Sequence, residues 1–234
     1  MKVRVKLASV CLTAGLLTAG AAAHAQDEED GDRWSIDGTI TVVSDYRFRG
    51  YSLSAKDPAV QPELWISHES GFYVGFWASN LADNGGDDVE IDPGIGYVGS
   101  VGPVDVDVYA LWYLYPGAAE LNYVELGTEL STDLAIGTLG LELGYAPAQG
   151  HIGGNANKYA AAKASVPLGG LPLSFDSSFG IEDGAFGDKK LDWSLGVTGE
   201  AGNFEFGAHY IDAARHGHDP LADPTVVASV SYSF

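Results

Sequence analysis

The sequence predicts an all-β fold: a transmembrane antiparallel up-and-down β-barrel of about 12 strands, with both termini on the periplasmic side. Three observations predict it. Apolar and polar residues alternate with a period of two from Trp34 to Phe234, which is typical of strands whose two faces meet different surroundings. The connections between the alternating segments are longer and shorter in turn. The apolar phase of the segments carries no charged residue, as a lipid-facing surface requires.

The first 33 residues are predicted to precede the barrel. Residues 1–25 have a basic start, an apolar run and a small-x-small cleavage site that ends at Ala25, which is the organisation of a cleaved secretory signal peptide. The apolar run is short for a membrane-spanning helix. Residues 26–33 are predicted to form an acidic linker, because their carboxylates lack the ordered spacing of a calcium-binding loop. The barrel domain is then residues 34–234.

Composition excludes several classes of protein. The 234 residues include 32 acidic and 12 basic ones, with a formal net charge of −20, so nucleic acid is not an expected partner. The only cysteine, Cys11, lies in the signal segment, which leaves the mature chain without disulfides or cysteine-based metal sites. No run of about eighteen apolar residues follows the signal, so a membrane-embedded form has to be a closed barrel.

Twelve segments show the period-two alternation. They cover residues 34–45, 59–68, 72–80, 89–99, 104–114, 121–131, 138–145, 158–166, 171–182, 190–199, 204–212 and 225–234. Each is assigned as a strand because apolar residues recur at every second position. In the same order, the apolar phase holds Trp34, Ile36, Ile40 and Val42; Val60, Leu64 and Ile66; Phe72, Val74 and Phe76; Val89, Ile91, Ile95 and Tyr97; Val104, Val106, Val108, Trp112 and Leu114; Val124, Leu126 and Leu130; Leu139, Leu141, Leu143 and Tyr145; Ala160, Ala162, Ala164 and Val166; Leu171, Leu173, Phe175 and Phe179; Leu191, Trp193, Leu195 and Val197; Phe204, Phe206, Ala208 and Tyr210; and Val226, Ala228, Val230 and Tyr232.

The connections support the up-and-down order. Five short turns alternate strictly with six mostly longer connections, which read YRFRGYSLSAKD, LADNGGDD, YPGAAE, APAQGHIGGNAN, DGAFGDK and AARHGHDPLAD. Outer-membrane barrels have short periplasmic turns and longer extracellular loops. We therefore expect the six longer connections outside the cell and the five turns, with both termini, on the periplasmic side.

The opposite phase is strongly charged and is predicted to face the lumen. The candidates for lining or narrowing a path are Asp45, Arg47, Arg49, Glu63, Glu90, Asp92, Asp105, Asp107, Glu125, Glu142 and Lys163, with the inward aromatic residues Trp65, Tyr73, Trp77, Tyr109 and Tyr113. Further inward residues are Tyr123, Tyr159, Asp176, Glu182, Asp192, Lys190 and Glu205. Arg47 and Arg49 either face acids across the lumen or pair with Asp45 or Glu63 and neutralise buried charge. The inward rings either line a narrow path or, as we expect, pack inside the lumen.

Aromatic residues gather at both ends of the predicted strands. Near the longer connections lie Trp112, Tyr145, Phe179, Trp193 and Tyr210, and near the turns lie Trp34, Phe72, Phe204, Tyr232 and Phe234. Two such belts are typical of a barrel that crosses two membrane interfaces. We expect Phe234 to close the barrel at the periplasmic rim and to mark the chain for the barrel-assembly machinery. Pro62 and Pro93 fall inside predicted strands, where each removes a ladder donor, so a bulge or a misplaced boundary is expected at each.

The stretch from Ser44 to Leu81 resembles a family of Gram-negative outer-membrane proteins, the TorF-type porins. The matching positions are Ser44, Tyr46, Phe48, Arg49, Gly50, Ser52 and Ser54; Asp57, Pro58, Ala59 and Gln61; and His68, Ser70, Gly71, Phe72, Tyr73, Gly75, Trp77, Ser79 and Asn80. The later stretches ELGYAPAQG and LDWSLGV are also similar. The resemblance implies an outer-membrane location and a barrel, and it is consistent with a pore.

These observations favour a narrow channel for small solutes or ions in the outer membrane of a Gram-negative bacterium. The expected partners are the lipid bilayer and the permeating solute, and no cofactor is expected. Since the inward face is mainly acidic, a water-filled path would concentrate cations. The alternative is a barrel with a closed lumen and a structural or ligand-binding role.

An outer-membrane hydrolase is a weaker alternative. It needs a nucleophile and a base within reach of each other. His209 is predicted to face inward near the outer rim, with Asp212 three residues later, and His68 is predicted on the lipid-facing phase. No serine, histidine and acid have a spacing that supports catalysis, so no enzyme activity is expected. His216 and His218 could bind a transition metal through imidazole, but we expect a solvated loop.

Overall fold

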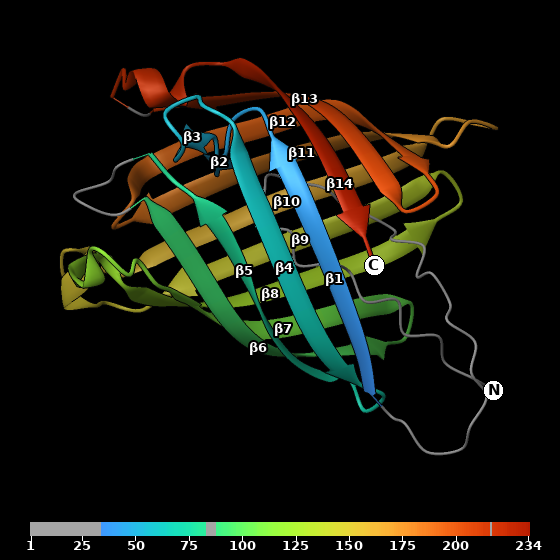
Figure 1. Cartoon of the computed structure of the whole chain (residues 1–234), viewed down its shortest axis with the longest axis horizontal. Helices are drawn as coiled ribbons and strands as arrows, with labels where there is room; N and C mark the ends of the chain where they lie inside the picture. Colours follow the sequence, from blue (N-terminus) through green and yellow to red (C-terminus); the bar gives the residue numbers. More distant parts are fainter. Residues whose placement is uncertain (1–33, 83–87, 216) are drawn as a thin grey trace.

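The computed structural model describes residues 34–82, 88–215 and 217–234. The predicted signal peptide and acidic linker lie outside the described residues. Twelve strands form a closed antiparallel barrel in which each strand pairs with its neighbours in chain order, and β1 pairs with β14 to close the sheet (Figure 1). The predicted up-and-down barrel of 12 strands is therefore confirmed.

Each predicted segment corresponds to one barrel strand. The barrel strands are β1 (Trp34–Val43), β4 (Ala59–His68), β5 (Phe72–Asn80), β6 (Val89–Val101), β7 (Val104–Tyr113), β8 (Tyr123–Leu134), β9 (Gly137–Ala146), β10 (Asn157–Pro167), β11 (Leu173–Gly184), β12 (Gly187–Ala201), β13 (Phe204–Ala214) and β14 (Thr225–Ser233). The remaining elements are the short strands β2 (Arg47–Phe48) and β3 (Tyr51–Ser52) and the 3₁₀ turns η1 (Ala119–Leu121), η2 (Gly150–Ile152) and η3 (Pro220–Ala222). No helix among the described residues is long and apolar enough to cross a membrane.

The predicted alternation of connections holds with one exception. The connection between β11 and β12 is a tight turn of residues 185–186, and the two strands extend beyond their predicted ends to meet it. The prediction of a longer connection there was wrong. Gly184, at φ 134°, lies directly opposite Gly187 beyond a register shift, and glycine permits such a reversal because it tolerates positive φ.

Both faces of the barrel follow the predicted phases. The apolar side chains point outward and are exposed, and the charged side chains point inward and are mostly buried. Charged residues on the outward phase correct the prediction of an uncharged outer face; three of them are Lys158 and Asp183, which lie opposite each other, and Asp212. All three lie within three residues of the loop-side strand ends, where a barrel surface tolerates charge better than at its middle.

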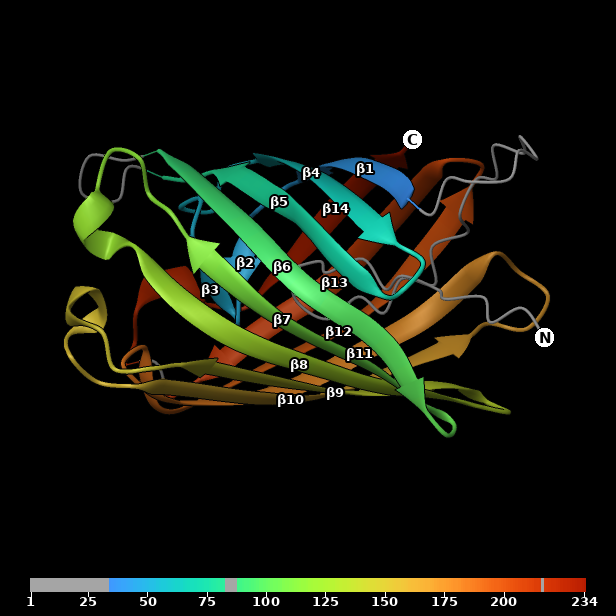
Figure 2. The same ribbon diagram turned by 90° about the horizontal axis from the view of Figure 1, so that it is seen from below.

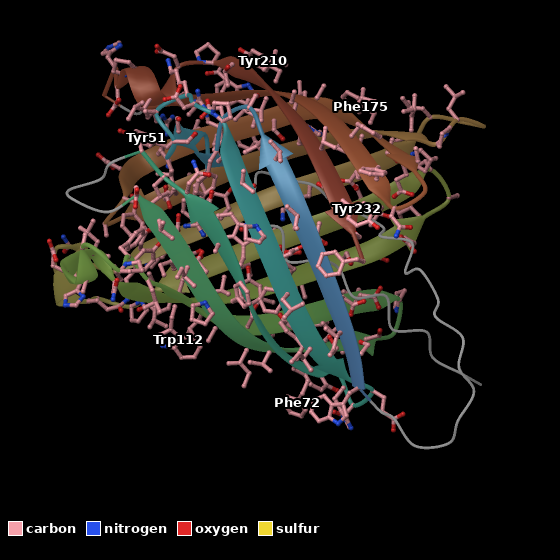
Figure 3. The ribbon with its side chains drawn as sticks, in the orientation of Figure 1. Tyr51, Phe72, Trp112, Phe175, Tyr210 and Tyr232 are labelled. Atoms are coloured by element: carbon pink, nitrogen blue, oxygen red, sulfur yellow. The ribbon has the colours of Figure 1, made fainter. Side chains whose placement is uncertain are left out.

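Aromatic side chains mark both ends of the outer surface. Phe72 lies toward the turn end, and Trp112 and Tyr210 lie toward the loop end (Figure 3). At the seam, Phe234 exchanges two backbone hydrogen bonds with Gly38, at 2.9 and 3.2 Å. A Cβ on Gly38 would lie 2.6 Å from the Phe234 ring, so the close approach of this ring requires a glycine.

Pro62 and Pro93 cause neither a bulge nor a strand boundary. Pro62 lies in unbroken register with β1, and Pro93 in unbroken register with β5. On its other side, each proline adjoins the end of a ladder: the β4–β5 ladder ends at Glu63, and the β6–β7 ladder ends at Gly94, beyond which one further bridge joins Ile91 and Leu114. The missing N–H of each proline therefore shortens one ladder and leaves the strand continuous.

The first connection folds into the barrel. Residues 44–58, which we call the inner loop, contain the β2–β3 hairpin and lie inside the loop-side half of the barrel (Figures 1 and 2). The alternation pattern predicted a long connection here but not its direction. The inner loop fills the loop-side part of the lumen and leaves the turn-side part free of this loop.

Candidate functional site

Arg47 fixes the inner loop to the barrel. Its Nε donates to Asp45 at 2.7 Å, and its Nη1 donates to the carbonyl oxygens of Gly50, Leu221 and Asp223 at 3.0 Å each. The last two acceptors lie in the η3 turn and directly after it, before β14, so Arg47 connects the first and last loop-side connections. The sequence left two roles open for Arg47, and pairing with Asp45 is the one observed.

Arg49 instead crosses the lumen. Its Nη2 and Nη1 donate to the two carboxylate oxygens of Glu125 at 2.6 and 3.1 Å, and Nη1 also donates to Glu182 at 2.9 Å. The guanidinium carbon lies 4.1 Å from the centre of the Tyr159 ring, within range of a cation–π interaction. Glu125, Tyr159 and Glu182 come from β8, β10 and β11, and together we call them the Arg49 cage.

The cage is buried, and the backbone of Arg49 within it is strained. Arg49 is 5% exposed, Glu125 is 2% exposed and Glu182 is 1% exposed. Arg49 has φ 48°, a left-handed conformation that costs about 1–2 kcal/mol for a residue with a side chain. Charge-assisted bidentate hydrogen bonds in a buried site are among the strongest in proteins, and they offset this cost.

Gly144 makes room for the ion pair. A Cβ built on Gly144 would lie 2.8 Å from Nη2 of Arg49 and 2.9 Å from Oε1 of Glu125. Any side chain at this position would push the guanidinium away from the carboxylate. The β9 strand therefore contributes to the cage by the absence of a side chain.

Inward aromatic residues donate hydrogen bonds to many of the lumenal acids. The bonds are Tyr73 to Asp107 at 2.8 Å, Tyr159 to Asp192 at 3.0 Å, Tyr46 and Tyr115 to Glu90 at 3.2 Å each, and Trp65 to Glu63 at 3.3 Å. A buried carboxylate needs such partners, because burial without a hydrogen bond is costly. The sequence assigned Trp65, Tyr73 and Tyr159 to the same face as the acids, but it did not pair them and assigned no face to Tyr46 or Tyr115.

Asp92 differs from these acids. Its side chain is 0% exposed, and no described residue donates a hydrogen bond to either of its carboxylate oxygens. Trp77, directly opposite Asp92 on β5, is buried as well. The loop-side lumen thus holds one buried acid without a donor among the described residues.

A second ion cluster lies deeper in the lumen. Lys163 of β10 donates to Glu129 at 3.2 Å and forms an ion pair with Glu142 at 2.7 Å. Lys163 is buried, while both glutamates are partly exposed. This cluster balances part of the acidic charge of the turn-side lumen.

Buried aromatic rings fill the lumen at its loop side and, through Trp65 and Tyr73, also toward the turn-side ends of β4 and β5. Trp65, Tyr73, Trp77 and Tyr113 are buried, and Tyr113 stacks on Tyr123 with ring centres 4.3 Å apart. Tyr109 is half-buried and packs against the same cluster. On the turn side of the inner loop, inward side chains are half-exposed, among them Thr39, Thr41, Glu205, Ser229 and Ser231. Water therefore reaches the turn-side lumen more readily than the layer of the inner loop.

The family described as "Bacterial protein of unknown function (Gcw_chp)" matches residues 28–234. The chain belongs to this family. No curated protein matches the sequence of this Gcw_chp chain.

Two solved porins have a similar fold. The KdgM porin superposes with a TM-score of 0.56 at 9% identity, and the NanC porin superposes with a TM-score of 0.52 at 10% identity. Each match covers 85% of the Gcw_chp chain and 98% of the porin. At this identity the likeness concerns the fold alone.

Some predicted site residues of the Gcw_chp chain lie away from the inner loop. Asp105 is exposed at the turn-side end of β7 and accepts a hydrogen bond from Ser100 at 2.6 Å. His209 lies at the middle of β13, not near the outer rim as predicted, and its Nε2 is 3.9 Å from Asp176. Asp212 points to the other face, so it is not a partner of His209.

The remaining histidines do not form a site among the described residues. His68 lies on the outward phase beside Trp34, with ring centres 4.6 Å apart. The described part of the chain holds no cluster of three histidine, cysteine or acidic side chains arranged for a metal. His216 lies outside the described residues, so the predicted solvated loop at His216 and His218 stays a prediction.

Glu182 and Tyr159 were missed as partners of Arg49. Their phase places both of them inward, and that signal was read correctly. The phase does not give their height in the barrel or the residue that faces them across the lumen. Only the inward fold of the inner loop brings Arg49 to them, and this fold has no local sequence signal.

Proposed function

We propose that this chain is an outer-membrane channel of a Gram-negative bacterium that passes small solutes or ions. The observation that carries the proposal is a closed 12-strand barrel with an apolar outer face and a charged inner face. The fold likeness to two porins and the resemblance of residues 44–81 to TorF-type porins support it. In this proposal the turn side, with both termini, is periplasmic, and no catalytic activity or cofactor is involved.

The channel is proposed to prefer cations. Each buried lumenal base already has an acidic partner: Arg47 has Asp45, Lys163 has Glu129 and Glu142, and Arg49 and Lys190 share Glu182. Glu63, Asp107 and Glu205 belong to no ion pair among the described residues, and each faces the lumen. Such a surplus of carboxylates raises the local concentration of cations and lowers that of anions.

A closed lumen is the second candidate, and the burial around Arg49 favours it. With Arg49, Glu125 and Glu182 nearly inaccessible, the structure holds the inner loop across the path. If the protein is a channel, it conducts when the inner loop shifts. If it is a closed barrel, it does not conduct at all.

Conductance of the refolded protein in a planar bilayer under a salt gradient separates these candidates. Discrete steps with a cation-selective reversal potential would support the channel. A silent bilayer from protein that is shown to be folded by heat-modifiable gel migration would contradict it and leave the closed barrel.

A further inference from the structure

We propose that the Arg49 cage is a recognition site for solutes with a guanidinium group, and that Arg49 occupies it as an internal substitute for the solute. The inference rests on the proposed function, because it names the class of solute that the channel would select. It starts from the observation that every group in contact with the guanidinium belongs to the barrel wall, except Phe48 beside it.

The wall residues match a guanidinium better than they match a simple cation. Glu125 binds it in a bidentate manner, Glu182 binds a third N–H, and the Tyr159 ring covers one of its faces. The planar fork of a guanidinium fits a carboxylate with two parallel hydrogen bonds and stacks on an aromatic ring, whereas an ammonium group does neither as well. The cage is therefore specific in shape as well as in charge.

The internal occupant fits the cage imperfectly. Arg49 Nε is buried and donates to no described acceptor, and the Arg49 backbone is held at φ 48°. A free guanidinium group carries neither constraint. At the border of the cage, Oδ2 of Asp192 is buried without a described donor, while Oδ1 accepts from Tyr159. Asp192 thus offers an unused acceptor for a solute N–H.

Charge also favours a cation once Arg49 leaves. Lys190 stays on Glu182 at 2.6 Å, but Glu125 loses its only ion-pair partner among the described residues. Glu125 would then be a buried, unpaired carboxylate, which is strongly unfavourable. A guanidinium solute restores the pair that the inner loop supplies in its present position.

The test is chemical rescue of the Arg49→Ala variant with methylguanidinium. The temperature at which the folded band converts on heat-modifiable gels is measured with methylguanidinium, methylammonium or sodium chloride at equal ionic strength. We expect methylguanidinium to raise this temperature by a few degrees in Arg49→Ala and not in the wild type, whose cage is occupied. The triple variant Arg49→Ala/Glu125→Gln/Glu182→Gln should not be stabilised by methylguanidinium. It should bind methylguanidinium at least tenfold more weakly than Arg49→Ala does.

Lys163→Ala is the matched control, because it removes the base that binds Glu129 and Glu142. Among the described residues, no aromatic ring forms a cation–π contact with Lys163. Equal stabilisation of Lys163→Ala by methylguanidinium would overturn the inference, and so would equal effects of the three salts on Arg49→Ala. If Arg49→Ala folds only with methylguanidinium present, that recovery supports the site. If Arg49→Ala fails to fold in every salt, Arg49→Gln takes its place, and absence of binding to it overturns the inference.

This experiment does not depend on conductance. Rescue in a protein that is silent in bilayers would keep the guanidinium site and reject the channel. Conductance without rescue would keep the channel and reject the guanidinium site.

Discussion

At the residue scale, tyrosine hydroxyls donate to three lumenal acids, Glu90, Asp107 and Asp192. Tyr73 and Asp107 show the pattern most simply, since both are buried and the hydrogen bond between them is 2.8 Å. The alternation of residue types predicts that both point inward. It does not predict their pairing, because Tyr73 on β5 reaches past β6 to a residue on β7.

Replacing Tyr73 with phenylalanine should destabilise the barrel. Asp107 would lose its only side-chain donor among the described residues while the ring volume is kept, and an unsatisfied buried acceptor costs about 1–3 kcal/mol. Urea unfolding of the refolded protein measures the loss, with Tyr145→Phe on the outer surface as the matched control. Equal stability of the two variants would show that water satisfies Asp107 equally well.

Tyr51 on the inner loop should make stability depend on alkaline pH. Partial burial and a hydrogen bond to Asp219 of 2.5 Å raise the pKa of Tyr51 from 10.0 to about 12. A group whose pKa is higher in the folded state stabilises the fold below its unfolded pKa and loses this contribution as pH rises. The loss should fall between pH 10 and pH 12. The Tyr51→Phe variant should lose less stability than the wild type over this window in urea titrations, and identical slopes would contradict the assignment.

At the scale of elements, the sequence predicts the barrel strands well and the inner loop poorly. Strand positions follow from local alternation, and even Pro62 and Pro93 remain within their predicted strands. The inner loop is held by contacts far away in sequence: Arg47 binds the carbonyl of Leu221, and Arg49 binds Glu125 and Glu182. Local patterns carry no information on such contacts. The two arginines were therefore recognised as candidates, but only one of their predicted partners, Asp45, was found.

The packing of β9 against the inner loop can be tested at Gly144. Alanine at this position would place a methyl group 2.8 Å from Nη2 of Arg49, and overpacking of this kind costs about 1–3 kcal/mol. Gly150→Ala is the control, because a Cβ there meets no atom within 4 Å. Gly144→Ala should unfold at a lower temperature than Gly150→Ala. Equal unfolding temperatures would show that the inner loop moves to accommodate the methyl group at little cost.

At the scale of the whole molecule, the barrel is asymmetric along its axis. Its loop-side half is filled by the inner loop and buried aromatic rings, while the turn-side half keeps half-exposed hydroxyl and carboxyl groups beside the buried Trp65 and Tyr73. Twelve strands enclose a narrower space than the sixteen to eighteen of open porins, so one inward loop is enough to fill it. In the proposed channel, we therefore expect the layer around Arg49 to decide passage through the barrel.

The most direct measurement compares single-channel conductance of the wild type and Arg49→Ala in planar bilayers under the same salt gradient. Removal of the guanidinium should widen the path and leave Glu125 unpaired, so we predict larger steps and a reversal potential shifted toward stronger cation selectivity. Identical conductance and selectivity in two folded proteins would contradict the account, because the layer around Arg49 would then not lie on the path.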